Sequence, residues 1–469
     1  MKPLALVTGF FLALIGAVWA HFAGLDRAIV ATIFITVLTA SWWVTEAMPI
    51  PATSLVPFAL FPLAGILTHK EAASALGSHV IILLMASFML SKALEKSALH
   101  ERLALYMIRL VGVSGRRLVL GFMVAAAVLS MWISNSATTL MLATLALAII
   151  ARDDNPRLAV PLLLGIAYAA SLGGTATLIG TPPNLIFADA YEHVTQTEYS
   201  FARFMVTGLP GVMVGVPVMA LWLTRSLGGV RAPTLPEPGP WRPAEVRTML
   251  VFGLAIVLWV TRAEPFGGWS GLFGITGAGD STVAVLAVVL MFLVPSGATQ
   301  TPERGSDRGG GGLLDWQSAS DIPWGLLLLF AGGICIAAGF RASGLDGVIG
   351  RSLADLASLP PFLMILGLCL SVTFLTEMTS NTATANLLMP VLAAVAVEAQ
   401  IAPALIMIPA VISASCAFML PVATAPNAIV YGTGKVSIGR MVREGLVLNI
   451  IIALIVASSA YLTLTSTAG

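Results

Sequence analysis

Charged residues are scarce in this chain of 469 amino acids. Only 10% of the residues are Asp, Glu, Lys or Arg, and 58% are hydrophobic, whereas about a quarter of an average soluble domain is charged. The net charge of +1 argues for no acidic partner, and we expect no nucleic-acid partner. The composition excludes an ordinary soluble domain and predicts an all-α polytopic membrane protein surrounded by membrane lipid.

Residues for metal and redox chemistry are also few. The five histidines form no ligand pattern, and the sequence contains no His-Glu-x-x-His. The cysteines lie far apart in apolar runs and fit no zinc or redox spacing, so we expect buried small side chains at Cys335, Cys369 and Cys416. An intramembrane protease has little support, and we expect no enzyme.

Long apolar runs fill most of the chain, and many reach the roughly 20 residues that cross a bilayer. We interpret residues 4–20 as an uncleaved first span, not a signal peptide, because another span follows within a few residues. The eleven predicted spans are 4–20, 27–48, 52–68, 79–109, 158–190, 204–224, 246–262, 271–295, 323–341, 403–432 and 441–464.

Two further pairs of apolar runs turn at Ser-Asn sequences. The pairs are 118–133 with 137–151 and 361–376 with 384–398. We interpret each pair as a re-entrant hairpin that enters and leaves by one face of the membrane. The alternative is two extra spans per pair, which would not change the orientation of the later spans.

The distribution of Lys and Arg predicts the orientation in the membrane. With the N-terminus inside, fifteen of them fall in cytoplasmic segments and six in outer segments, as the positive-inside rule requires. We therefore expect a protein of the inner (plasma) membrane with a cytoplasmic N-terminus and the C-terminus outside. Residues 296–320, which include four glycines from Gly309, predict a flexible cytoplasmic loop and no phosphate site, because no Lys-Ser/Thr follows.

A short pattern occurs twice. Ser134–Thr138 reads Ser-Asn-Ser-Ala-Thr and is followed by Gly-Thr-Pro-Pro-Asn at 180–184. Ser380–Thr384 reads Ser-Asn-Thr-Ala-Thr and is followed by Ala-Thr-Ala-Pro-Asn at 423–427. Such residues inside apolar runs mark helix breaks, which a membrane tolerates only around a cavity or bound ion. A duplicated pair of breaks is typical of a secondary transporter.

The duplication also divides the chain into domains. Residues 1–26 form the first span, 27–225 repeat 1, 226–245 a cytoplasmic linker and 246–469 repeat 2. Each repeat holds five spans and one hairpin. Five is odd, so the repeats must have opposite orientations, and the two hairpins should meet from opposite faces around a midplane site.

The two hairpin tips offer ligands for both a cation and an anion. Carbonyl, amide and hydroxyl oxygens suit an alkali cation, and amide NH₂ groups, hydroxyls and helix N-termini suit a carboxylate. No Lys or Arg lies within ten residues of Asn135 or Asn381. The charge of an anionic substrate must then be offset by bound cations and helix dipoles, which favours a cation-coupled carrier. Among acids in apolar surroundings, Glu377, just before the second tip, is the better functional candidate, as a partner that holds the tip. Glu46 is equally well explained by a structural role.

These motifs resemble the divalent anion:sodium symporter (DASS) family, in particular bacterial INDY-type di- and tricarboxylate transporters. Further similar segments are Trp43–Pro49 and Leu326–Gly333, so the resemblance covers nearly the whole chain. It implies an elevator-type homodimer and Na⁺ as the coupling ion. By matching positions, sodium site 1 would use Ser130, Ser134, Asn135 and Gly180, and sodium site 2 would use Thr376, Thr379, Asn381 and Ala423. The substrate would contact Asn135, Ser136, Asn381, Thr382 and Thr424. Ser136 replaces the usual Thr, and Ala425 stands where a double proline is common.

The leading hypothesis is sodium-coupled import of a C4-dicarboxylate such as succinate, malate or fumarate. The alternatives are a sodium-independent dicarboxylate exchanger, or a citrate or sulfate carrier of the same fold. A cation/proton antiporter is disfavoured because neither tip holds an Asp or His.

Overall fold

The computed structural model describes residues 2–113, 115–151, 157–227, 235–264, 267–275, 277–297, 311–353 and 359–466. Within these ranges the chain is helical, and the only β contact is an isolated bridge between Pro295 and Gly312. Eight helical stretches there are long and apolar enough to cross a membrane. The predicted all-α, multi-pass membrane fold is confirmed.

The helices follow one another in two series of the same order. Helix α1 (Pro3–Phe22) precedes both. The first series is α2 (Arg27–Thr45), α3 (Ile50–Thr53), α4 (Val56–Leu63), α5 (His69–Ser74), α6 (His79–Ser97), α7 (Leu99–Val111), α8 (Gly115–Ser130), α9 (Asn135–Ile150), α10 (Ala159–Gly173), the 3₁₀ turn η1 (Gly174–Ala176), α11 (Pro182–Thr195) and α12 (Phe201–Leu223). The second is α13 (Pro243–Val260), α14 (Gly268–Leu272), α15 (Asp280–Leu293), α16 (Trp316–Ser320), α17 (Trp324–Ser343), α18 (Leu345–Leu353), α19 (Pro361–Thr376), α20 (Asn381–Glu398), α21 (Pro403–Ala414), α22 (Ala425–Gly432) and α23 (Ile438–Ser466).

Several predicted spans are broken into shorter helices. The predicted span 79–109 ends as α6 at Ser97, because Ala98 takes a left-handed conformation with φ 58° and starts α7 in a new direction. The predicted span 52–68 is two short helices, α3 and α4, each with proline in its first turn. Proline is tolerated there because the first N–H groups of a helix have no intrahelical partner.

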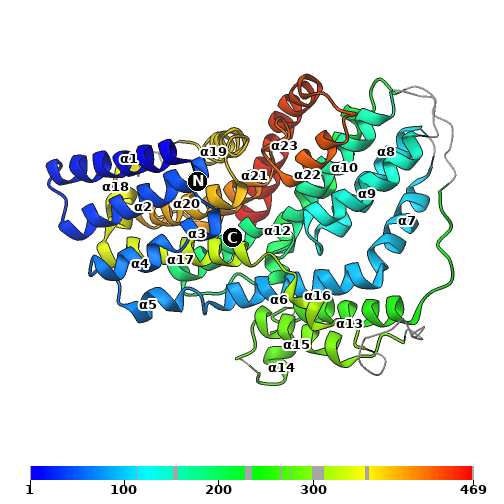
Figure 1. The fold of residues 1–469 in the computed structure, drawn as a ribbon, viewed down its shortest axis with the longest axis horizontal. Helices are drawn as coiled ribbons and strands as arrows, with labels where there is room; N and C mark the ends of the chain where they lie inside the picture. The colour runs from blue at the N-terminus through cyan, green and yellow to red at the C-terminus, as the bar shows by residue number, and fades with distance from the viewer. Residues whose placement is uncertain are drawn as a thin grey trace.

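The two series exchange helices. Helix α6 of the first series packs against α13 and α15 of the second, and α17 of the second packs against α2, α3 and α4 of the first. In Figure 1, α6 and α7 run above α13 to α15, while α17 lies among the N-terminal helices at the other end. Likewise α22 packs on α9 and α11 on α20. Because corresponding helices make corresponding contacts, both series contribute to one central site.

The predicted flexible loop 296–320 is partly wrong. From Gly311 the chain is tied to the body, with Leu313 and Leu314 buried and Asp315 capping α16 while it contacts Lys96 of α6. The apolar pair beside the glycines explains the anchoring, since burying it removes apolar surface from water. Gly309 and Gly310, and residues 228–234 of the predicted linker, lie outside the described residues.

Candidate functional site

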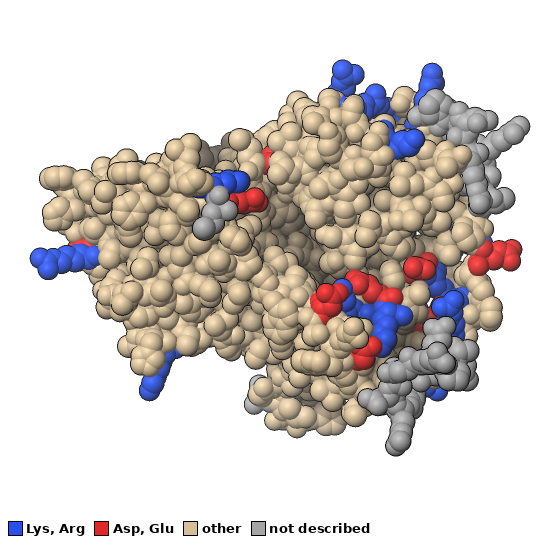
Figure 2. All heavy atoms as spheres, in the orientation of Figure 1, with Lys and Arg blue, Asp and Glu red and all other residues tan. Residues whose placement is uncertain are grey.

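A cavity of about 770 Å³ lies where the two hairpin tips and the two helix breaks meet. Its walls include all five residues predicted to contact substrate, namely Asn135, Ser136, Asn381, Thr382 and Thr424. Ser134, Gly180 and Ala423 of the predicted sodium sites line it as well. The face drawn in Figure 2 is hollowed near its middle, and acidic and basic side chains gather beside the hollow, over α6 and α16.

The first tip is the turn between α8 and α9. Ser134 caps α9, and its hydroxyl accepts a hydrogen bond from the Ala137 N–H at 3.2 Å. The Ser130 hydroxyl donates to Asn135 Oδ1, so the last residue of α8 is joined to the first residue of α9. Two ligands of the predicted sodium site 1 are thus in direct contact, while the hydroxyl of Ser134 serves the helix start.

The first break lies between α10 and α11. The Asn184 amide donates to the carbonyls of Gly174 at 3.1 Å and Thr177 at 2.7 Å, which the end of the helix leaves without helical partners. The Thr177 hydroxyl lies 2.6 Å from the Met131 carbonyl and accepts from Gly180 N–H at 3.1 Å. These bonds hold the break against the tip and bring Gly180 toward Asn135.

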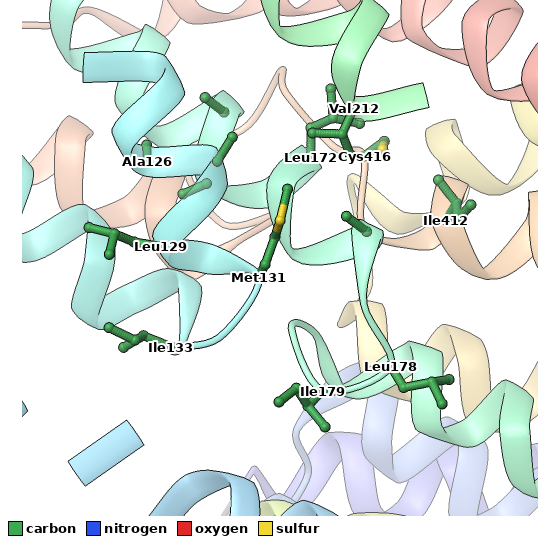
Figure 3. Close-up of a cluster of buried hydrophobic side chains, with 14 of the residues drawn as sticks. Ala126, Leu129, Met131, Ile133, Leu172, Leu178, Ile179, Val212, Ile412 and Cys416 are labelled. Carbon is green, nitrogen blue, oxygen red and sulfur yellow. The ribbon is translucent and has the colours of Figure 1, made fainter. Parts of the chain in front are cut away.

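The first tip and the first break come close together at Gly174. A Cβ at this position would lie 2.7 Å from Asn135 Oδ1 and 3.0 Å from the Gly180 carbonyl oxygen. Asn135 and Gly180 therefore lie against Gly174, and Ser130 is linked to them through its bond to Asn135. Sequence reasoning did not single out Gly174. Figure 3 shows apolar side chains of this region: Met131 and Ile133 come from the tip, Leu172 from the end of α10, and Leu178 and Ile179 from the break.

The second tip repeats this geometry with different residues. Thr376 Oγ1 lies 2.9 Å from both Asn381 Oδ1 and the Ala414 carbonyl, so the end of α19 is joined to the start of α20. Thr379 is placed differently from its predicted partners: its hydroxyl lies 2.6 Å from the Thr384 hydroxyl and 3.0 Å from the Leu375 carbonyl. Thr376 and Asn381 are thus in contact, and Thr379 is bonded to its own turn.

The second break, between α21 and α22, repeats the asparagine bonds of the first. The Asn427 amide donates to the carbonyls of Ala417 and Leu420, each at 3.0 Å. These acceptors lie ten and seven residues before Asn427, the same separations as for Asn184. Thr424 caps α22 by accepting from Asn427 N–H at 3.2 Å and also faces the cavity. In both breaks the Asn is fully buried, so it fixes the local backbone.

The two candidate acids have different positions. Glu377, buried at the end of α19, accepts from backbone N–H groups of the second break, so it supports the break, whereas sequence reasoning placed it at the tip. Glu46 has an exposed side chain, ends α2 with φ 48° and lies 4.0 Å from Lys2. Its position supports the structural interpretation.

Sequence reasoning missed a charged group in the cavity wall. Lys92 of α6 lies 3.0 Å from Asp321 and 3.6 Å from Glu95, and all three line the cavity. Lys92 is distant in sequence from both tips, so the search for nearby cations could not find it. The available signal was a Lys and a Glu three residues apart inside an apolar run.

Comparisons with known proteins agree with this architecture. Residues 40–407 match the family model described as "Citrate transporter". The chain belongs to the divalent anion:sodium symporter family. A protein of Staphylococcus saprophyticus named sodium-dependent dicarboxylate transporter SdcS is 37% identical over 91% of this chain and 84% of its own length. A Staphylococcus aureus protein of the same name is 36% identical over 98% and 90%. This DASS member is thus a transporter and not an enzyme.

A solved structure shares the fold. The YdaH transporter of Alcanivorax borkumensis aligns with a TM-score of 0.57, covering 84% of this chain and 88% of the other, at 12% sequence identity. At that identity the likeness concerns the fold alone.

Proposed function

We propose that this transporter imports C4-dicarboxylates together with sodium. The observation that carries the proposal is the cavity itself, whose walls bring together two copies of a neutral Ser-Asn-Ser/Thr tip and two neutral breaks. Such a wall offers oxygens to a hard cation and N–H and O–H donors to a carboxylate. The relatives named sodium-dependent dicarboxylate transporters support the same pairing of solutes.

Sodium is here a transported solute and binds to neutral oxygens. Among the described residues, no group of three or more His, Cys, Asp or Glu side chains could hold a metal ion. The Ser130–Asn135 and Thr376–Asn381 pairs instead each place a hydroxyl and an amide beside a helix break, which suits a monovalent cation. We assign sodium site 1 to the first pair with Ser134 and Gly180, and site 2 to the second with Thr379 and Ala423.

The matched contacts of the two helix series support an inverted repeat, with residues 27–225 and 246–469 in opposite orientations. We further propose an elevator-type movement in a homodimer of the inner membrane, with the N-terminus in the cytoplasm. Citrate is the second candidate substrate, favoured by the description of the matching family model.

Uptake into proteoliposomes tests the proposal. Labelled succinate should accumulate with an inward sodium gradient and not with potassium in its place. Unlabelled malate and fumarate should compete more strongly than citrate or sulfate. Stronger competition by citrate would indicate that citrate is the substrate, and equal uptake without sodium would indicate an exchanger.

Two substitutions test the site assignment. Asn135→Ala and Asn381→Ala should each abolish or severely reduce uptake while leaving a folded protein, because each removes a group proposed to serve a cation and the substrate. Glu46→Gln, at an exposed acid away from the cavity, is the matched control and should transport normally. Normal transport by both Asn variants would refute the assignment.

A further inference from the structure

The two halves differ at one pair of positions behind the tips. In the first half the residue after Ser130 is Met131, and Val212 of α12 belongs to the same buried apolar cluster, part of which Figure 3 draws. In the second half the residue after Thr376 is Glu377, and Asn449 of α23 contacts it. An apolar pair in one half corresponds to a carboxylate and an amide in the other.

The correspondence of α12 with α23 rests on two glycines. A Cβ on Gly208 of α12 would lie 2.6 Å from the Thr175 carbonyl oxygen in the first break. A Cβ on Gly445 of α23 would overlap the Phe418 carbonyl in the second break and lie 2.7 Å from Met419 Cα. Val212 follows Gly208 by four residues, and Asn449 follows Gly445 by four residues. Four residues make one helical turn, so Val212 faces the first break and Asn449 faces the second.

The Glu377 carboxylate accepts four hydrogen bonds. Oε1 accepts from the N–H groups of Phe418 at 2.7 Å and Met419 at 2.8 Å and from the Asn449 amide at 2.7 Å. Oε2 accepts from the Leu420 N–H at 2.9 Å. All four partners are donors, which suits a carboxylate acceptor. Glu377 is 3% exposed, so these donors supply its whole polar surroundings within the described contacts.

The backbone follows different paths in the two breaks, which explains why only the second half has a carboxylate at this position. After α10 the first break continues as the 3₁₀ turn η1, whereas after Ala414 the second break has no helical turn before α22. The N–H groups of residues 418–420 thus lack helical acceptors, and an unpaired buried N–H is costly. Glu377 supplies these acceptors from the end of α19, and Asn449 holds the carboxylate in place.

We propose that Glu377, oriented by Asn449, is a positioning residue for sodium site 2. It is adjacent to Thr376 at the tip and holds residues 418–420, three residues before Ala423. It thereby sets the spacing between the two chain segments that supply the oxygens of this site. In the first half a neutral bond, from the Thr177 hydroxyl to the Met131 carbonyl, joins tip and break instead. The charge of Glu377 also favours a cation in the second half, and Met131 gives no such effect in the first. This inference rests on the proposed sodium coupling.

The test is the sodium dependence of succinate uptake in Glu377→Gln. The amide keeps the size of the side chain, but its NH₂ must face a backbone N–H, and the negative charge is lost. We expect the sodium concentration for half-maximal uptake to rise at least tenfold and the sodium curve to become less steep. The maximal rate at saturating sodium should stay within a few-fold of wild type. Glu46→Gln removes a charge from an exposed acid and should match wild type.

Asn449→Ala is the second variant, in case Glu377→Gln does not fold. It removes one donor to Oε1 and the 3.1 Å bond from Phe418 N–H to Asn449 Oδ1, but keeps the carboxylate. We expect a smaller rise in half-maximal sodium, about three- to fivefold. A folded Glu377→Gln with a wild-type sodium curve, or with only a lower maximal rate, would overturn the positioning role. If Glu377→Gln does not fold, a wild-type curve for Asn449→Ala would do the same. Wild-type uptake that ignores sodium would instead overturn the sodium coupling, and this inference with it.

Discussion

Gly174→Ala should weaken sodium binding without weakening the fold. The new Cβ would lie 2.7 Å from Asn135 Oδ1 and 3.0 Å from the Gly180 oxygen, and ordinary van der Waals contact begins at 3.4 Å. The Asn135 amide must therefore move by roughly 0.7 Å and the Gly180 carbonyl by roughly 0.4 Å. A binding site tolerates displacements of about 0.5 Å, and a misplacement of about 1 Å can cost about 100-fold. We therefore expect half-maximal sodium to rise about 10- to 100-fold.

The backbone itself should accept the substitution. Gly174 has φ −57° and ψ −19°, values that Ala adopts readily, and such a replacement commonly stabilises by about 0.4–1 kcal/mol. This gain offsets part of the cost of moving the Asn135 amide. Thermal unfolding of the purified protein should thus occur near the wild-type temperature, while sodium-driven uptake in proteoliposomes requires more sodium. Gly253→Ala is the control, because a Cβ there meets nothing within 4 Å. A stable Gly174→Ala protein with the wild-type sodium curve would refute the placement of site 1.

Three further predictions concern the substrate and the ion pairs. Ser136→Ala should weaken succinate binding by about 1–3 kcal/mol and Ser136→Thr should remain active with a changed competition profile, whereas a pure helix-start role would leave that profile unchanged. Arg102→Ala should lower the free energy of unfolding by about 3–5 kcal/mol, because it leaves the buried carboxylate of Glu245, 2.9 Å from Arg102, without its counter-charge. Adding Glu245→Gln to this variant should recover part of the loss. Hydrogen bonding to Lys96 lowers the pKa of Asp315 to about 2. The stabilisation of α16 by Asp315 is therefore complete above about pH 4 and is lost as the pH falls through 2. Hydrogen exchange of residues 315–320 should show this loss, and Asp315→Asn should abolish the pH dependence.

The tips and breaks could be predicted because their signals are local. Ser134 and Thr424 are good helix caps, and Pro182 and Pro426 lie within the first two residues of α11 and α22. A polar cap and a proline inside an apolar run indicate a helix start wherever the rest of the chain goes. The duplication of the pattern then predicts that both copies reach one site, and the cavity contains both.

Helix breaks without a local signal could not be predicted. Ala98 favours helix intrinsically, yet it separates α6 from α7 with a positive φ. The turn directs α7 so that Arg102 reaches Glu245 and the carbonyls of Gly239 and Pro240, far along the chain. That buried ion pair depends on the tertiary fold, and the apolar run 79–109 alone reads as one span.

The partners of charged residues could not be predicted from the sequence either. Lys92 pairs with Asp321 across more than 200 residues, and Glu377 reaches Asn449 across 72. Sequence reasoning recognised Glu377 because an acidic residue in an apolar membrane segment is a functional candidate by default. It assigned Glu377 to the tip and missed the break, because that contact depends on where the fold places the N–H groups of residues 418–420.

In the proposed mechanism, each tip couples the two solutes through one residue. Asn135 belongs to sodium site 1 and to the substrate site, and Asn381 belongs to sodium site 2 and to the substrate site. A cation that orders the Asn also prepares the donor that the carboxylate needs, so no separate relay is required. Coupling between binding sites is reciprocal. The factor by which saturating sodium raises succinate affinity must therefore equal the factor by which saturating succinate raises the overall binding constant of the sodium ions, the product over both sites. Unequal factors at equilibrium would mean that the two measurements report different states, and the shared Asn residues alone could not then account for coupling.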